Sequence, residues 1–90
     1  MPTIEELKTY LGIDGSHLDS LLADFLNTAR ELVEKVLRYK IESLQPMPGL
    51  VKEALKYSVG VLYTNRETAN IGELELTLAR LLQSLRKEGF

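Results

Sequence analysis

The sequence of 90 residues contains no cysteine, which excludes disulfide bonds, thiolate metal sites, iron–sulfur clusters and cysteine nucleophiles. It has no excess of basic residues, because 11 Lys and Arg stand against 13 Asp and Glu, for a net charge of −2. This balance argues against a basic nucleic-acid coat and against a polybasic membrane arm. No apolar run approaches the roughly 18 residues of a membrane-spanning helix, so we expect no membrane partner.

The length and the apolar content fit a single small domain over residues 1–90. Hydrophobic residues make up 44% of the chain, which argues against disorder. A domain of this size buries only about 60–65% of its unfolded surface, so its own core gives marginal stability. Association with further copies is a common remedy, and we therefore consider oligomerisation from the start.

The N-terminal segment predicts a short helix over Ile4–Leu11. Thr3 and Glu6 have the spacing of a capping box, in which each side chain accepts a hydrogen bond from the other residue's backbone amide. The apolar residues of the segment fall on one helical face. Gly12 suits the left-handed backbone conformation that ends many helices, so we expect the helix to stop there.

A long helix is predicted next, because apolar residues recur every three or four positions over 18–37 with no proline or glycine between them. Ser16 or Asp14 is expected to cap its start. His17, the only histidine, lies beside acids at this point, and we interpret it as an exposed first-turn residue. One imidazole with loosely spaced carboxylates is not the pattern of a metal site.

Two prolines indicate a loop over Ser43–Gly49, and a third helix is predicted over about Gly49–Arg66. This helix is apolar on most sides, which is typical of a central helix. Gly60 costs about 1 kcal/mol relative to alanine in its interior, and we expect a crossing helix to approach closely there. A polar loop over Glu67–Glu73 leads to a last helix over about Leu74–Lys87. The expected fold is all-α, a small single-domain bundle of about four helices, two long and two short.

Charge is spread unevenly along the chain. Residues 1–34 carry a net charge of −5, residues 35–66 a net charge of +4, and residues 67–90 a net charge of −1. An acidic block followed by a basic block would suit a head-to-tail contact between copies. The more ordinary interpretation, which we favour, is pairing between helices of one molecule together with solvated faces.

No constellation of residues predicts catalysis, a metal site or a cofactor site, so we expect no enzyme. Asp14, Asp19 and Asp24 lack the order of a calcium-binding loop, and no glycine-rich phosphate loop follows a strand. A helix-turn-helix reader is rejected as the main hypothesis, because acidic residues at the start of its second helix would repel phosphate.

One side of the predicted third helix begins with two lysines and then becomes apolar. In an isolated domain the first or last helix would cover this apolar end, and in an assembly it would form a contact between subunits. Tyr and Arg are frequent anchors of such contacts. The candidate interface residues are Val59, Tyr63, Arg66 and Glu67.

Three segments, in this order, resemble the small head–tail connector proteins of long-tailed bacteriophages and prophages. Residues Ile4–Asp14 are similar to the family's opening helix and turn. A proline-started central helix then ends in Leu62-Tyr63-x-Asn65-Arg66-Glu67, which resembles the family's Tyr-x-Asn-Arg-Glu signature. The spacing Leu78-x-x-Leu81-Leu82-x-x-Leu85-Arg86 is similar to its closing helix, so the likeness covers nearly the whole chain.

The resemblance implies a structural role. Such proteins form a homo-oligomeric ring below the portal, extend the DNA channel and offer a docking surface to tail or head-completion proteins. It implies a location at the head–tail junction of the virion, after a stage in the bacterial cytoplasm, with DNA passing through without specific binding. The alternative is a generic helical interaction module or regulator that forms no ring.

Overall fold

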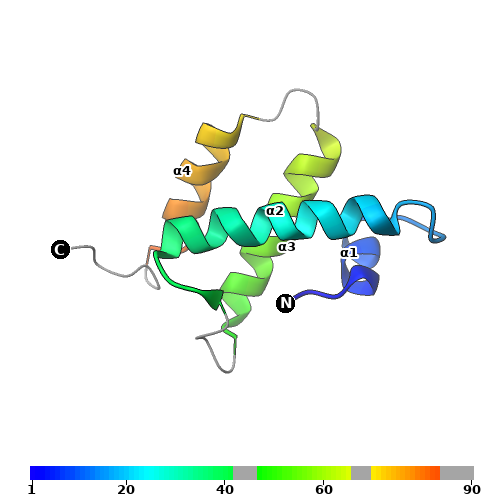
Figure 1. Ribbon diagram of the computed structural model, residues 1–90, viewed down its shortest axis with the longest axis horizontal. Coiled ribbons are helices and arrows are strands. Elements are labelled where there is room, and N and C mark those ends of the chain that lie inside the picture. The colour runs from blue at the N-terminus through cyan, green and yellow to red at the C-terminus, as the bar shows by residue number, and fades with distance from the viewer. Residues whose placement is uncertain (42–46, 66–69, 84–90) are drawn as a thin grey trace.

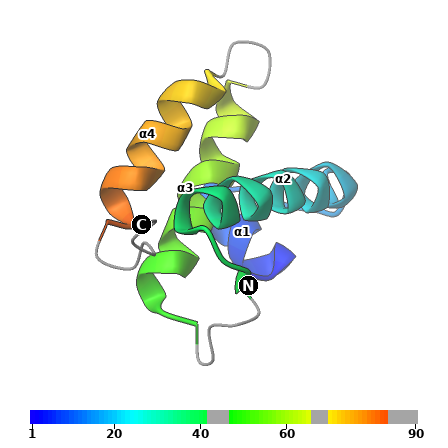
Figure 2. The same ribbon diagram turned by 60° about the vertical axis from the view of Figure 1, so that its left-hand side comes forward.

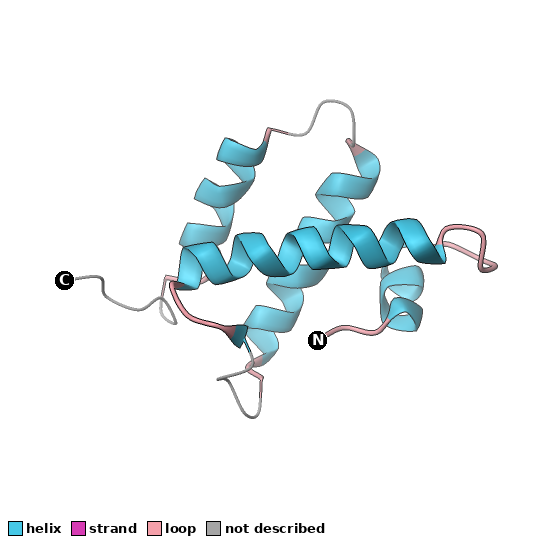
Figure 3. Cartoon of the chain, viewed as in Figure 1, coloured by secondary structure: helices cyan, strands magenta, loops and turns pink. Residues whose placement is uncertain are grey.

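Four α-helices and no strand make up the part of the chain that the structure, a computed structural model, describes: residues 1–41, 47–65 and 70–83 (Figures 1 and 3). The predicted all-α class with two longer and two shorter helices is confirmed. The helices are α1 (Ile4–Leu11), α2 (Asp19–Leu37), α3 (Gly49–Thr64) and α4 (Ile71–Leu81).

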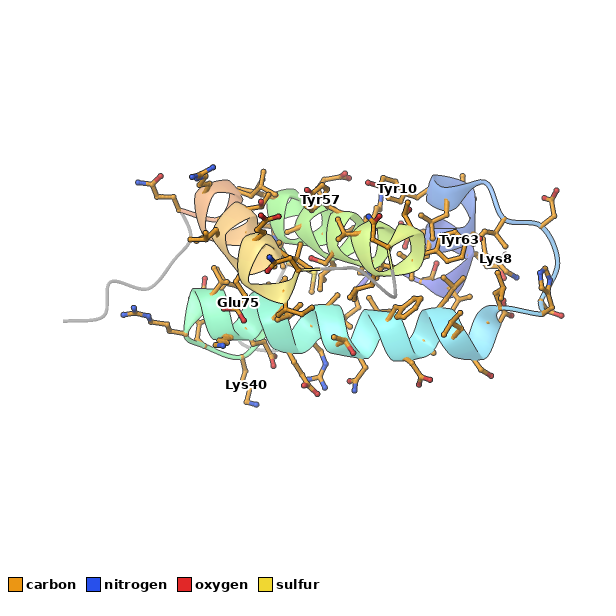
Figure 4. All side chains as sticks on the ribbon, turned by 90° about the horizontal axis from the view of Figure 1, so that it is seen from above. Lys8, Tyr10, Lys40, Tyr57, Tyr63 and Glu75 are labelled. Atoms are coloured by element: carbon orange, nitrogen blue, oxygen red, sulfur yellow. The ribbon has the colours of Figure 1, made fainter. Side chains whose placement is uncertain are left out.

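The helices lie in two layers. Helix α2 forms one layer by itself, and α1, α3 and α4 lie side by side in the other, as the view along the layers shows (Figure 4). Helix α2 runs across the other three helices and contacts each of them. Within the second layer, α3 lies between α1 and α4 (Figure 2). With 19 residues, α2 is about 28 Å long, enough to bridge the whole second layer.

The core lies between the layers and draws a leucine from every helix. Leu7, Leu22, Leu55 and Leu78 have no exposed surface, and each belongs to a different helix. One polar side chain, Ser58, is buried with them. Its hydroxyl donates to the carbonyl oxygen of Ala54 at 2.8 Å, so the hydroxyl donor is satisfied inside the helix.

Local chemistry explains how α1 begins and ends. The capping box is confirmed, because the Thr3 amide donates to Glu6 Oε1 at 3.0 Å and the Glu6 amide donates to Thr3 Oγ1 at 3.1 Å. Gly12 adopts a φ of 72° and its amide donates to the Lys8 carbonyl, which closes the helix as predicted.

Two helix starts differ from the predictions. Helix α2 follows Leu18 with no side-chain cap, so the prediction of Ser16 or Asp14 as the cap is wrong. A backbone turn supplies a partner instead, because the Asp19 amide donates to the carbonyl of Ser16 at 3.2 Å.

Helix α4 begins at Ile71, three residues before the predicted start. The Asn70 side chain accepts a hydrogen bond from the Glu73 amide at 3.1 Å and so caps a turn that we had assigned to a loop over Glu67–Glu73. Helix α3 ends at Thr64, two residues short of its predicted end. Helix α4 ends at Leu81 with Leu82 as its C-cap, so the predicted end of the last helix at Lys87 is wrong. Residues 84–87 lie outside the described residues.

Gly60 permits the predicted close approach of a crossing helix, and that helix is α1. A Cβ atom at Gly60 would lie 3.3 Å from Tyr10 Cε2 and 3.7 Å from Leu11 Cδ2. Tyr10 is 48% exposed, so its ring has room to move by a few tenths of an ångström. A methyl group is therefore tolerated there, whereas a long side chain would displace α1.

We expect Gly60→Ala to raise the free energy of unfolding by up to about 1 kcal/mol, because alanine is the better helix former and Tyr10 can yield. Gly60→Leu is expected to lower it, because the larger side chain collides with α1. Chemical denaturation of the two variants beside the wild type measures both effects. Equal destabilisation by alanine and leucine would show that the contact with α1 is rigid.

Candidate interaction surface

The side of α3 that we proposed for subunit contact is covered by α1 within the molecule. Lys52, at the start of this side, pairs with Glu6 of α1 at 2.6 Å between Nζ and Oε2. Further along, Val59 has no exposed surface and belongs to the core. The isolated-domain interpretation therefore describes this side of α3, since the first helix seals its apolar end.

The four predicted interface residues fall in different places. Val59 is a core residue with no exposed surface, so its prediction as a surface contact is wrong. Its side chain packs inside one molecule and cannot reach a neighbouring copy. Tyr63 is partly exposed and packs against the core near α1 (Figure 4). Arg66 and Glu67 lie outside the described residues, and their contact with a neighbouring copy stays a prediction.

Charges of opposite sign meet between helices, as the favoured interpretation of the charge blocks predicts. Besides the bond between Lys52 and Glu6, Lys8 Nζ lies 2.9 Å from Asp19 Oδ1 and joins α1 to the start of α2. Lys35 Nζ lies 3.0 Å from Glu75 Oε1 and joins α2 to α4. Much of the acidic and basic blocks is thus matched inside one molecule.

Two of these pairs shift a pKa. The hydrogen bond from Lys52, followed by the one from the Thr3 backbone, lowers the pKa of Glu6 from 4.5 to about 2. The hydrogen bond to Asp19 raises the pKa of Lys8 above its ordinary value. Glu6 therefore serves α1 twice, with one oxygen in the capping box and the other in the ion pair to α3.

The depressed pKa of Glu6 predicts a loss of stability in acid. A carboxylate whose pKa is lower in the folded state adds stability that is fully present above about 4.5 and is lost as the pH falls toward about 2. Glu6→Gln keeps the capping oxygen and removes the charge. We expect the wild type to be the more stable protein at neutral pH and the difference to vanish between pH about 4.5 and 2, as measured by urea denaturation. A difference independent of pH would refute this role of the ion pair.

Two aromatic side chains are exposed on the face that is turned away from α2. Tyr10 on α1 is 48% exposed and Tyr57 on α3 is 38% exposed, and Figure 4 shows both on this face. Tyr57 borders a hollow of about 250 Å³ between α3 and α4, and Tyr10 borders another between α1 and α3. The sequence hinted at Tyr57 only by its position outside the main apolar stripe of its helix.

Among the described residues, the most exposed large apolar side chain lies on the flank between α2 and α4. Leu76 is 62% exposed and lines a hollow of about 460 Å³ together with residues from the C-terminal end of α2. Leu76 is not among the predicted interface residues. The sequence signal for its exposure is its place on the helix, about 160° around the axis from the buried leucines Leu74 and Leu78.

Neither a metal-binding cluster nor a membrane-spanning helix occurs in the part of the chain that the structure describes. No group of three or more His, Asp or Glu that could hold a metal ion occurs over residues 1–41, 47–65 and 70–83. None of the helices in that part of the chain has the length and apolar character needed to cross a membrane.

The described part of the chain is thus a small all-α fold that leaves apolar side chains exposed on two of its faces. The family described as Phage gp6-like head-tail connector protein matches residues 1–87, and the chain belongs to this family. It is therefore a structural connector protein of phages. The resemblance noted in the sequence is confirmed. Searches of curated proteins and of solved structures gave no significant match.

Proposed function

We propose that this chain forms a homo-oligomeric ring that joins the portal of a phage head to the tail or to head-completion proteins and extends the DNA channel. The observation that carries the proposal is the family match over residues 1–87. Exposed apolar side chains on different faces of the molecule agree with it, because a ring subunit needs separate surfaces for its two neighbours.

The charge distribution suits a conduit through which DNA passes without being held. Every lysine of the described residues forms an ion pair with a carboxylate; these are Lys8, Lys35, Lys40, Lys52 and Lys56. Paired lysines release fewer counterions on meeting phosphate, so they contribute less to salt-dependent DNA binding. We propose that DNA moves through the ring without specific contact.

Titration with duplex DNA tests this part of the proposal. Even at low salt we expect a dissociation constant above about 10⁻⁴ M, the weak end of non-specific binding by DNA-binding proteins at physiological salt. Fluorescence anisotropy with a labelled duplex provides the measurement. Tight binding, with an association constant whose logarithm falls steeply as the logarithm of the salt concentration rises, would mean that the chain holds DNA through its phosphates. Such a result would contradict the proposal that DNA passes through freely.

The connector role itself is tested in the phage or prophage that encodes the chain. A nonsense mutation in its gene is expected to yield separate heads and separate tails, and supply of the wild-type chain in trans is expected to restore joined particles. Electron microscopy of the lysates distinguishes the two results. Complete, infectious particles without the chain would contradict a connector role and favour an interaction module that forms no ring.

A further inference from the structure

After the internal ion pairs are set aside, acidic charge remains at one end of α2. Residues 9–29 contain three aspartates and no Lys or Arg. Asp19 is paired with Lys8, whereas Asp14, in the loop between α1 and α2, and Asp24, on α2, are exposed and form no ion pair with any described residue. Beside Asp14 lies Ile13, an apolar side chain that packs against the core with one part and is exposed with the other.

Basic charge and an exposed apolar side chain meet at the other end of α2. Residues 35–41 contain three basic residues and no acid. Arg38 is exposed and makes no ion pair within the described residues. Together with the exposed Leu76 of α4, it lines the hollow of about 460 Å³. Val36 and Ala79 give the hollow an apolar wall. Its rim carries the ion pair of Lys35 with Glu75 and, beside it, the positive charge of Arg38.

Arg38 also occupies an unusual backbone position. It ends α2 with a φ of 69°, the left-handed conformation in which glycine is the common residue. A non-glycine residue there costs roughly 1–2 kcal/mol. The chain thus places a guanidinium at the mouth of the hollow at some expense in stability.

We propose that the hollow between α2 and α4, bordered by Arg38 and Leu76, docks the loop between α1 and α2 of a second copy of this chain. In this contact Asp14 of one copy faces Arg38 of the next, and Ile13 covers Leu76. This inference rests on the proposed ring and names the surfaces that would build it. Charge complementarity selects a second copy as the occupant, since the acidic and the basic end belong to the same molecule.

The two surfaces lie at opposite ends of α2, which is about 28 Å long (Figure 1). One molecule therefore cannot bring its own loop to its own hollow. A contact between unlike ends is heterologous, and repeated contacts of this kind close into a ring when the rotation between copies allows it. The contact thus supplies both the attraction and the geometry that a ring requires.

Disulfide cross-linking tests the contact directly, because the natural chain has no cysteine. We expect the double variant Ile13→Cys/Leu76→Cys to form a ladder of covalent oligomers on a non-reducing gel under mild oxidation. The matched control is Ile13→Cys/Leu81→Cys, since Leu81 is 41% exposed and lies about 140° around α4 from Leu76. We expect the first pair to cross-link about tenfold faster or more, owing to its higher effective concentration.

Equal ladders from the two pairs, or none from the first, would overturn this docking site. Sedimentation of the wild-type chain separates this failure from that of the proposed function: rings without the ladder mean a different contact face, and monomers alone mean that the ring is wrong as well. Charge reversal gives a second measurement, free of cysteine. Arg38→Glu and Asp14→Arg are each expected to weaken association, and their combination to restore it; additive weakening would refute the pairing.

Discussion

Leu55→Ala is expected to lower the free energy of unfolding by about 3 kcal/mol. Leu55 lies in α3, between α1 and α4 and against α2, and it has no exposed surface. Truncation removes buried apolar atoms and leaves a cavity that rigid neighbours fill only in part, which costs 2–5 kcal/mol in comparable cores. The whole stability of a chain of 90 residues is only about 5–13 kcal/mol, so one such change consumes much of it.

The control for this prediction is Leu81→Ala. Leu81 is 41% exposed, and the same truncation there is expected to change the stability by no more than about 0.5 kcal/mol. Urea denaturation followed by circular dichroism measures both variants. Similar losses at Leu55 and Leu81 would mean that the core does not lie between the two helix layers.

The melting temperature of the wild-type chain is expected to rise with protein concentration. Any partner that binds only the folded state stabilises it by mass action, by about 2.7 kcal/mol at one hundred times the dissociation constant. In a domain of this size 1 kcal/mol corresponds to about 4–8 °C, so a shift of roughly 10–20 °C is expected across the assembly transition. The proposed ring makes sister copies that partner.

Calorimetry over a dilution series provides the measurement, with sedimentation on the same samples as the control for association. Samples that sediment as monomers are expected to share one melting temperature, and samples that sediment as oligomers to melt higher. A constant melting temperature across samples that do associate would show that assembly does not stabilise the folded state described here.

The helices could be predicted from the sequence because their signals are local. The capping box of Thr3 and Glu6 and the left-handed Gly12 bound α1 at the predicted residues. The start of α4 was missed because Asn70 lies in a polar stretch, where a cap and a loop residue have the same composition. Periodicity marks where an apolar face exists, and caps mark where a helix begins only when they are distinguishable from turns.

The interaction surface could not be predicted in the same way, because it depends on which helix covers which face. The apolar side of α3 that holds Val59 was equally compatible with a cover inside the molecule and with a neighbouring copy. The structure gives that cover to α1, through the contact at Gly60 and the ion pair of Glu6 with Lys52. Leu76 is left exposed because α4 packs on α2 and α3 by its other side.

The charge blocks illustrate the same limit. Net charges of −5 and +4 over the first two blocks predicted attraction between them, but not which residues pair or whether they belong to one molecule or to two. Internal pairs such as Lys35 with Glu75 account for part of it, and the exposed Asp14 and Arg38 at opposite ends of α2 are what remains. Only the three-dimensional arrangement separates the charges that hold the fold from those available to another copy.

Native mass spectrometry of the full chain at increasing concentration tests the ring most directly. We expect monomers at low concentration and, above it, one dominant closed oligomer of a single copy number, with few intermediates. A monomer at every concentration, or an open series of oligomers without a preferred size, would contradict a ring-forming connector.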